Sequence, residues 1–308
     1  MPETVTSFER VAILGAGGQV GRALIAALGG RAIPLTRAEA DLTDVENLLA
    51  ALERIAPDAV INAAGYTQVD KAESEQELAM RVNAGAPAAI AVWCAKRDVP
   101  FVHYSTDYVF DGSGDKPWRE EDATEPLNAY GQSKLAGEKA VSDSGGKWLI
   151  LRTSWVYDAQ GSNFLNTMLR LGAEREALRV VADQYGAPTY APHLAEATVR
   201  ILEKSAEKQD FPAGVYHMVN AGETTWHGFA EAIFAAAAEQ GETPSIPLKI
   251  KTVEPIPAVA YPTPAIRPAN SRLDTSKLFN TFGERLPDWQ SGLAEAMEKK
   301  RASHRLPD

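Results

Sequence analysis

The chain has 308 residues, of which 45% are hydrophobic and 23% charged, and its formal net charge is −10. The composition is typical of a folded globular protein and excludes wholesale disorder. The negative charge excludes a general surface for nucleic acid or anionic membrane, although a few arginines or backbone N–H groups suffice to hold a small anion.

Short apolar runs alternate with amphipathic segments through the first half of the chain. We expect strands at residues 11–14, 32–35, 59–62, 99–104 and 148–151. The segments between them predict helices at 20–28, 45–55, 69–82, 87–96 and 130–142. This alternation predicts an α/β protein with a Rossmann-like doubly wound parallel sheet and helices on both faces.

The second half is less regular. Its patterns predict helices at 163–172, 193–203 and 226–240, and a strand at 214–219. Five prolines between residues 255 and 268 exclude regular helix and predict a rigid surface loop, with a polyproline recognition segment as the alternative.

A glycine-rich turn joins the first expected strand to the first helix. Gly15, Gly18 and Gly21 have the spacing G-x-x-G-x-x-G. Glycines permit a tight turn and a close approach of the backbone to a pyrophosphate, which the helix N-terminus attracts. The context of strand, turn and helix predicts dinucleotide binding rather than a plain turn, with contacts from Gly15, Gly17, Gly18, Gln19 and Val20.

The end of the second strand indicates which dinucleotide is bound. An acid there holds the ribose 2′-hydroxyl of NAD, whereas this chain has Thr36 followed by Arg37. An arginine in this place suits a 2′-phosphate, so the sequence favours NADPH over NADH. The alternative for Arg37 is a solvated surface charge. Asp41 and Leu42 are further expected contacts of the cofactor.

Polar residues follow the third and fourth strands. Asn62 to Gly65 ends one strand, and Ser105 to Asp107 ends the next. Ligands of open α/β sheets lie outside the carboxyl ends of the strands, so both segments should meet the glycine turn at one edge. We expect Thr106 to hydrogen-bond a substrate carbonyl, unless it only caps its strand, and we expect the cofactor to contact Ala63, Ala64 and Gly65.

Tyr130 and Lys134 lie four residues apart in an expected helix, and therefore on one face of it. A nearby ammonium lowers the pKa of a tyrosine, which lets the phenol transfer a proton at neutral pH. Such pairs also arise by chance on helix surfaces. Together with Thr106 and a bound hydride carrier, the pair predicts the reduction of a carbonyl group.

The single cysteine, Cys94, excludes an intrachain disulfide and a cysteine-based metal site. It stands in an apolar run, where we expect a buried structural thiol. The five histidines show no close metal-ligand spacing, so no metal site is predicted. The first ten residues carry acids and no apolar segment, and no apolar stretch approaches the roughly 18 residues of a membrane span. We therefore expect a soluble cytoplasmic protein.

The set Thr106, Tyr130 and Lys134 resembles the hydroxyl–Tyr–Lys triad of the extended short-chain dehydrogenase/reductase family. Longer runs are similar to signatures of one branch, the dTDP-4-dehydrorhamnose reductases. These runs are VDKAE (69–73), HYSTDYVF (103–110), RTSWVY (152–157), DQYGAPT (183–189) and YPTPAIRP (261–268). The resemblance extends from about residue 10 to residue 290.

This resemblance implies reduction by NADPH of the C4 ketone of dTDP-4-dehydro-β-L-rhamnose to dTDP-β-L-rhamnose, the last step of dTDP-L-rhamnose biosynthesis. Tyr130 would protonate the new alkoxide and Thr106 would polarise the carbonyl. Lys134 would lower the pKa of Tyr130 and hold the nicotinamide ribose. The substrate would then contact Thr67, Thr106, Asp107, Tyr130, Trp155 and Arg267.

A composition shift near residue 155 predicts two lobes. The dinucleotide-binding domain would span 1–155, with 177–218 returning to it, and a smaller α/β substrate-binding lobe would span 156–176 and 219–308. Some members of the family join two subunits through magnesium bound by glutamates, in places where this chain has Ala23 and Pro192. We therefore expect no metal bridge, and a monomer or weak dimer.

Two alternatives stay open. An NAD-retaining sugar-nucleotide epimerase would share the triad but should carry an acid where Thr36 stands. A non-catalytic relative, such as the regulatory β subunit of methionine adenosyltransferase, would act as a binding partner only. The intact set Thr106, Tyr130 and Lys134 favours an enzyme.

Overall fold

A six-stranded parallel sheet forms the centre of the computed structural model, which describes residues 8–238 and 248–305. The strand order is β10-β5-β4-β3-β1-β2. The chain places β2 on one side of β1 and then β3, β4 and β5 on the other side, so the strand order reverses between β1 and β3. Ligands of such sheets bind at that point. The strands are β10 (Gly214–His217), β5 (Trp148–Thr153), β4 (Phe101–Thr106), β3 (Ala59–Asn62), β1 (Val11–Leu14) and β2 (Ala32–Leu35).

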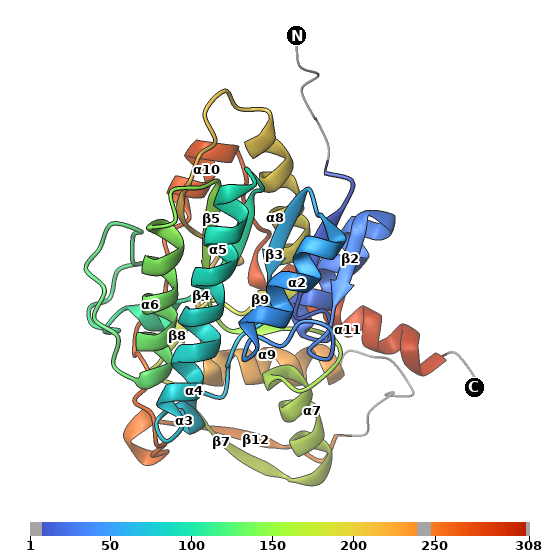
Figure 1. Cartoon of the computed structure of the whole chain (residues 1–308). Helices are drawn as coiled ribbons and strands as arrows, with labels where there is room; N and C mark the ends of the chain where they lie inside the picture. Colours follow the sequence, from blue (N-terminus) through green and yellow to red (C-terminus); the bar gives the residue numbers. More distant parts are fainter. Residues whose placement is uncertain (1–7, 239–247, 306–308) are drawn as a thin grey trace.

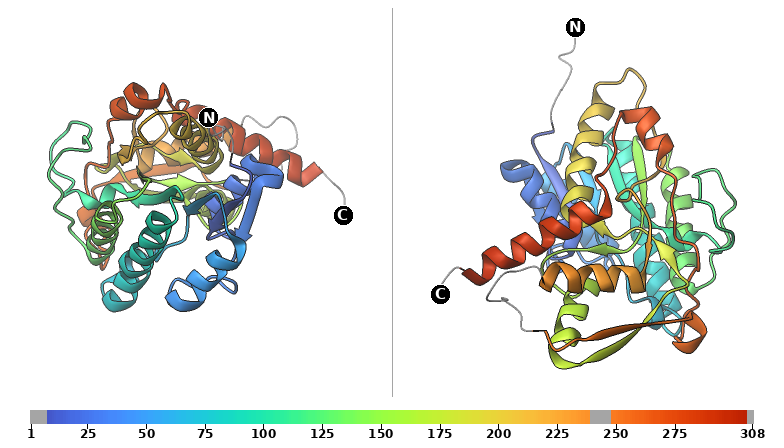
Figure 2. Two further views of the ribbon diagram at one scale, coloured as in Figure 1. Left: turned by 45° about the horizontal axis from the view of Figure 1, so that its top comes forward. Right: turned by 180° about the vertical axis from the view of Figure 1, so that it is seen from behind.

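Helices cover both faces of this sheet and make a three-layer structure (Figures 1 and 2). Strand side chains alternate, so Val11 and Ile13 join the core on one face, while Ala12 and Leu14 join the core on the other. The predicted α/β doubly wound sheet is therefore confirmed. The first face packs against α1 (Gln19–Leu28), α8 (Ala191–Ala206) and α10 (Ser276–Phe282), and the second against α2 (Val45–Ile55), α5 (Ala86–Lys96) and α6 (Ala129–Ser142).

Side chains cap the helices that frame the site. The Asp44 carboxylate accepts a hydrogen bond from the Asn47 backbone at the start of α2, and the left-handed Ala56 ends that helix before Pro57. Asn128 caps α6 by accepting from the Gly131 backbone N–H at 2.8 Å. The position of Tyr130, one residue into α6, therefore depends on this cap.

The expected helix at 69–82 is not continuous, which corrects that prediction. It divides into α3 (Val69–Ala72), α4 (Gln76–Met80) and a π-helical turn, η2 (Arg81–Gly85). Within the turn, the Asn83 side chain bonds both backbone groups of Tyr66 and the Ser133 hydroxyl. The π-turn thus ties the segment after β3 to α6, and such turns often occur at functional sites.

The α4 helix, the π-turn and α5 form one helix of 21 residues, Gln76–Lys96, with the length and apolar composition of a membrane span. This corrects the expectation that no apolar stretch approaches that length. The helix packs against α2 and α6, and Ile90, Trp93 and Cys94 fill the sheet core. Packing within the protein therefore accounts for its composition, and the predicted burial of Cys94 is confirmed.

A second core lies beside the sheet. In it the parallel pair β7 (Ala177–Val181) and β12 (Thr252–Ile256) packs with α7 (Phe164–Glu174), α9 (Trp226–Ala238) and α11 (Trp289–Arg305). Figure 1 shows β7 and β12 below the sheet. Within the segment 177–218, β10 joins the central sheet and α8 packs on one face of it. Strand β7 of the same segment pairs with β12 in the second core. The sequence patterns predicted neither the strands β7 and β12, which pair with each other, nor the helices α10 and α11.

Two short strand pairs and one long segment connect these parts. The pairs are β6 (Val156–Tyr157) with β9 (Thr189–Tyr190), and β8 (Tyr185–Gly186) with β11 (Thr224–Thr225). After β12 the chain runs through residues 257–275, here called the crossing segment. Near its end, Leu273 forms an isolated parallel bridge with Trp118 in the loop before α6. Apart from the 3₁₀ turn η4 (Ala258–Ala260), no helix occurs in the crossing segment, as the prolines predict. Two further 3₁₀ turns are η1 (Gly29–Arg31) and η3 (Asp107–Val109).

Candidate active site

The glycine turn after β1 is shaped by contacts that leave no room for a side chain. Gly15 has a φ of +79°, and a Cβ atom there would lie 2.7 Å from the Ala64 nitrogen. A Cβ on Gly21 would lie 2.1 Å from the Gly15 carbonyl oxygen. The turn therefore brings the segment after β3, with Ala63 and Ala64, against the first glycine. This cradle fits a dinucleotide pyrophosphate at the N-terminus of α1.

The remaining predicted residues of the turn are placed differently. Gly17 is exposed and has open space around it. Gln19 begins α1 and accepts a hydrogen bond from Asn163 at 2.9 Å, while Val20 packs against the core. Gly18 donates to the Gly15 carbonyl at 2.9 Å and closes the turn.

Beyond β2 the structure shows an acid that the sequence reasoning missed. The Glu39 carboxylate accepts hydrogen bonds from the backbone and the hydroxyl of Thr36, both at 2.8 Å. These bonds lower the pKa of Glu39, so a negative charge stands at the end of this strand. Our expectation considered only Thr36 and Arg37, and the turn after β2 brings an acid there from three residues beyond Thr36.

Arg37 lies in the same turn, with 80% of its side chain exposed, and pairs with Asp41 at 3.0 Å. Asp41 also accepts from the backbone and hydroxyl of Thr43, and its pKa is lowered, chiefly by the backbone bond. Leu42 is buried in the sheet core. Ala16 donates to the Leu35 carbonyl at 3.3 Å, which places this turn next to the glycine turn.

Thr106 and Tyr130 meet at the carboxyl end of β4. The Thr106 hydroxyl lies close enough to the Tyr130 phenol to lower its pKa, and it accepts a hydrogen bond from the Tyr108 backbone at 3.2 Å. Thr106 therefore both caps the 3₁₀ turn η3 and contacts the tyrosine, so the two interpretations of this residue are compatible. Burial raises the pKa of Tyr130 to about 12, which keeps the phenol protonated at neutral pH.

Lys134 lies on the same helix, and its amine contacts β4. Its expected effect on the pKa of Tyr130 stays a prediction. Its Nζ atom donates to the Tyr104 carbonyl oxygen at 2.6 Å and lies 3.3 Å from His103 Nε2. Burial lowers the pKa of Lys134 to about 8. The lysine is directed to the backbone of β4 rather than to the phenol, because a buried amine needs hydrogen-bond partners.

Asp107 is 2% exposed and shares the site with Thr106. Its carboxyl group accepts a hydrogen bond from Thr106 and lies near Ser271 of the crossing segment, and within the described residues Oδ2 has no hydrogen-bond partner. Burial raises the pKa of Asp107 to about 7. An unpaired buried oxygen is costly, so Asp107 is suited to accept a hydrogen bond from a ligand hydroxyl.

Trp155 is held in a left-handed backbone conformation, with φ of +49°. Its ring stacks on Trp226 with centroids 3.7 Å apart. A Cβ on Gly186 would lie 2.8 Å from the Trp155 ring and 3.2 Å from Ser271, which lies near Asp107. These contacts place Trp155 beside the Asp107 end of the site.

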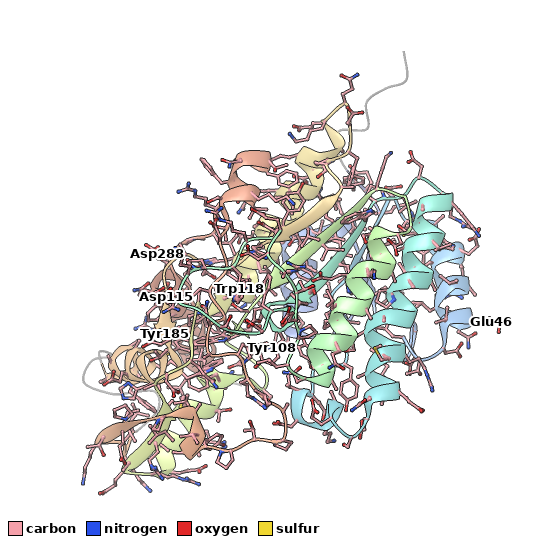
Figure 3. All side chains as sticks on the ribbon, turned by 90° about the vertical axis from the view of Figure 1, so that its left-hand side faces the viewer. Glu46, Tyr108, Asp115, Trp118, Tyr185 and Asp288 are labelled. Carbon is pink, nitrogen blue, oxygen red and sulfur yellow. The ribbon has the colours of Figure 1, made fainter. Side chains whose placement is uncertain are left out.

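Arg267 binds Asp70 through two hydrogen bonds, of 2.6 and 2.8 Å. Arg267 lowers the pKa of Tyr108 and Asp70 raises it. The ring of Tyr108 packs edge-on against that of Tyr130, with ring centroids 5.7 Å apart. Thr67 is exposed just before α3. Figure 3 shows Tyr108 and Tyr185 between α6 and the second core. The predicted substrate residues therefore surround the region next to Tyr130, although the Arg267 side chain is bound to Asp70 and does not face open solvent.

No group of three or more His, Cys, Asp or Glu side chains that could hold a metal occurs within residues 8–238 and 248–305. Ala23 and Pro192 line a cavity of about 240 Å³ between α1 and α8. Arg22, Asp158, Glu196 and Lys299 also line it, so both signs of charge face this cavity.

Comparison with known proteins identifies the family. Residues 9–302 match the family described as the RmlD substrate binding domain. A dTDP-4-dehydrorhamnose reductase of Burkholderia thailandensis is 49% identical over 287 residues, covering 91% of this chain and 95% of the relative. The Escherichia coli dTDP-4-dehydrorhamnose reductase is 48% identical over 259 residues, covering 84% of this chain and 85% of that protein.

Solved structures agree with the sequence comparison. The crystal structure of dTDP-4-dehydrorhamnose reductase from Bacillus anthracis in complex with NADP has a TM-score of 0.85 and 35% identity, covering 94% of this chain and 99% of that one. A UDP-glucose 4-epimerase from Brucella ovis in complex with NAD has a TM-score of 0.77 at 16% identity, covering 95% and 98% of the two chains. The second likeness shows a shared fold alone.

Proposed function

The chain belongs to the family described as the RmlD substrate binding domain, and from that premise we propose that it is a dTDP-4-dehydrorhamnose reductase. The reaction is the reduction by NADPH of the C4 ketone of dTDP-4-dehydro-β-L-rhamnose. Its product, dTDP-β-L-rhamnose, completes dTDP-L-rhamnose biosynthesis.

The proximity of Thr106 to Tyr130 is the observation that supports this function most strongly, because the hydroxyl lies close enough to lower the pKa of the phenol. It brings a hydroxyl at the end of β4 next to a protonated phenol. A ketone oxygen bound between the two groups would accept one hydrogen bond from each, and the bond from Tyr130 would carry the proton that the reduction needs.

The glycine cradle and the segment Ala63 to Gly65 are proposed to hold the cofactor. When bound, NADPH supplies the hydride that reduces C4. Tyr130 donates its phenolic proton to the C4 oxygen, which becomes a hydroxyl group. Thr106 orients that oxygen, and we assign Lys134 to the cofactor ribose. The high pKa of Tyr130 suits this direction, because a reduction needs a protonated donor.

We propose that the substrate lies between the sheet edge and the second core, with the second core as the substrate-binding lobe. Asp107 accepts a sugar hydroxyl, and Trp155 packs against the sugar nucleotide. Thr67 and Arg267 lie further out and would face the nucleotide. Each assignment rests on the placement of these side chains around Tyr130.

One assay tests the function. Purified protein with NADPH and dTDP-4-dehydrorhamnose should oxidise NADPH in a one-to-one ratio with dTDP-rhamnose formed, the product being identified by NMR. An absence of turnover would point to a non-catalytic relative. Conversion of sugar nucleotides without net oxidation of NADPH would instead indicate an epimerase.

We further propose that the protein acts in the cytoplasm as a monomer or weak dimer. A lone buried thiol suits a reducing compartment. Ala23 and Pro192 cannot ligate magnesium, so sedimentation velocity should give the same mass with magnesium and with EDTA. A mass that falls on chelation would contradict this proposal.

A further inference from the structure

A buried chain of hydrogen bonds runs from the cofactor turn to Lys134. The Ala64 backbone N–H donates to Asn62 Oδ1 at 3.1 Å, and Asn62 Nδ2 lies 3.1 Å from His103 Nδ1. His103 Nε2 in turn lies 3.3 Å from Lys134 Nζ. Asn62 is 0% exposed and His103 is 1% exposed, so water does not supply alternative partners at the surface.

The direction of every bond in this chain follows from the Ala64 backbone, because an amide N–H only donates. Asn62 must turn its oxygen toward Ala64, which leaves its NH₂ group facing His103. The Nδ1 atom of His103 must therefore accept. A neutral imidazole with an accepting Nδ1 carries its proton on Nε2, and that proton points at Lys134.

An ammonium group has three donors and no acceptor, so it cannot receive the Nε2 proton of His103. A neutral amine has one lone pair. It can accept from His103 and still donate to the Tyr104 carbonyl, at 2.6 Å. Within the described residues, the neutral amine is the state that satisfies both contacts of Lys134.

We propose that His103 is a positioning residue in the free protein: it donates its Nε2 proton to the Lys134 amine and so stabilises the neutral form of that amine against the ammonium. Since Ala64 also lies against Gly15, the chain of bonds joins the cofactor turn to the catalytic lysine. The protonation of Lys134 then depends on the position of that turn. The catalytic importance of the lysine rests on the proposed function, whereas the bond directions concern the free chain alone.

The charged groups around α6 are consistent with this arrangement. Burial lowers the pKa of Lys134 to about 8, and burial likewise lowers the pKa of His103 well below its ordinary value. Glu138 favours the ammonium, but two hydrogen bonds to Arg152 of β5 offset its charge. The negative charge of Asp107, just after β4, raises the pKa of Tyr130. The side chain of Arg81 in η2 is exposed.

The test is a pH titration of the free protein by NMR, with lysine side chains labelled at Cε and Lys134 assigned from the Lys134→Met spectrum. The wild-type signal should titrate near pH 8. In His103→Phe the midpoint should rise by about one unit or more, because the amine loses its donor. A wild-type midpoint near the ordinary lysine value, or no change in His103→Phe, would overturn the proposal.

Asn62→Asp reverses the direction of the chain by offering His103 Nδ1 an acceptor, which frees Nε2 to accept from an ammonium. The Lys134 midpoint should rise in this variant too, but hardly change when Asn62→Asp is added to His103→Phe. An equal rise in both backgrounds would show that the new charge acts directly, and would contradict the role of His103.

A measurement on the unaltered protein covers the case in which a variant does not fold. The ¹⁵N shifts of the histidine ring should show His103 neutral and protonated on Nε2. Protonation on Nδ1, or an imidazolium, would overturn the proposal. No substrate is needed in these experiments, so their failure is distinguishable from failure of the proposed reductase activity.

Discussion

The two sides of the candidate site are built from contacts of different range. On the cofactor side, Gly15, Ala64 and Thr106 stand at the ends of adjacent parallel strands, and the sheet itself brings them together. On the substrate side, Asp70 pairs with Arg267 across 197 residues of the chain. The crossing segment supplies that partner. The cofactor side therefore depends on the pairing of neighbouring strands in the sheet, whereas the substrate side depends on distant loops staying in place.

The largest effect should come from Tyr130→Phe, which removes the proton donor where the two sides meet. We expect kcat to fall by about 10²–10⁴-fold, the usual range for general acid catalysis. NADPH affinity, measured by fluorescence titration, should stay unchanged. Tyr66→Phe is the matched control, because Tyr66 packs nearby and its hydroxyl donates to Glu75. Loss of NADPH binding in Tyr130→Phe would instead indicate a structural tyrosine.

Trp226→Ala should affect the substrate side alone. Without its stacking partner, Trp155 can leave its left-handed conformation, so we expect KM for the dTDP-sugar to rise about tenfold, close to the ~1.4 kcal/mol of a strong aromatic pair. KM for NADPH should not change. Trp226→Phe keeps an aromatic face and should retain most of the affinity. A similar rise for both substrates would contradict the separation of the two sides.

Arg37→Ala tests the cofactor side and should have a smaller effect, since the side chain is 80% exposed. KM for NADPH should rise by about two- to fivefold, as expected for an exposed charge pair of up to ~1 kcal/mol. KM for NADH should stay constant. Arg170→Ala, which removes another exposed arginine paired four residues away, is the control. Equal changes for both cofactors would exclude a contact with the 2′-phosphate.

The same measurement on Glu39→Gln should give the opposite result. Its carboxylate stands at the end of β2 and would repel a 2′-phosphate. Removal of that charge should lower KM for NADPH relative to KM for NADH. If the KM for NADH fell instead, the Glu39 carboxylate would hinder the binding of NADH rather than that of NADPH.

Asp107→Asn should give the smallest effect, a change in the pH dependence of stability. Burial raises the pKa of Asp107 to about 7, so the folded protein binds an extra proton between about pH 4 and 7. Wild-type stability therefore falls as pH rises through this window and stays reduced above it. The Tm of the variant minus that of the wild type should grow by a few degrees from pH 4.5 to pH 8. Asp115→Asn, at an exposed loop, should show no such trend.

Much of the cofactor side could be predicted because its signals are local. The strands at 11–14, 32–35 and 59–62 and the helix at 45–55 have the expected bounds. Glycine spacing and the strand ends then place Gly15, Ala64 and Thr106 at one edge. Glu39 was missed because a turn, rather than the strand end, brings its carboxylate to Thr36.

The substrate side offered fewer signals. Trp226 carries no mark of its stacking on Trp155, and Ser271 lies 164 positions after Asp107 with no pattern to connect them. The pairing of β7 with β12 was likewise missed, because short strands far apart in sequence have no periodicity that names their partner. Contacts of this kind depend on how distant segments pack.

Sequence patterns alone predicted the doubly wound sheet, the glycine turn and the placement of Thr106, Tyr130 and Lys134 at the carboxyl edge of that sheet. Periodicity and spacing act over a few residues, and parallel strands then align their own ends. The direction of the Lys134 amine, by contrast, follows from how the helix packs on the sheet. A helix spacing of four places it on the face of Tyr130, but burial directs it to the Tyr104 carbonyl and to His103, because a buried amine must find partners wherever the fold provides them.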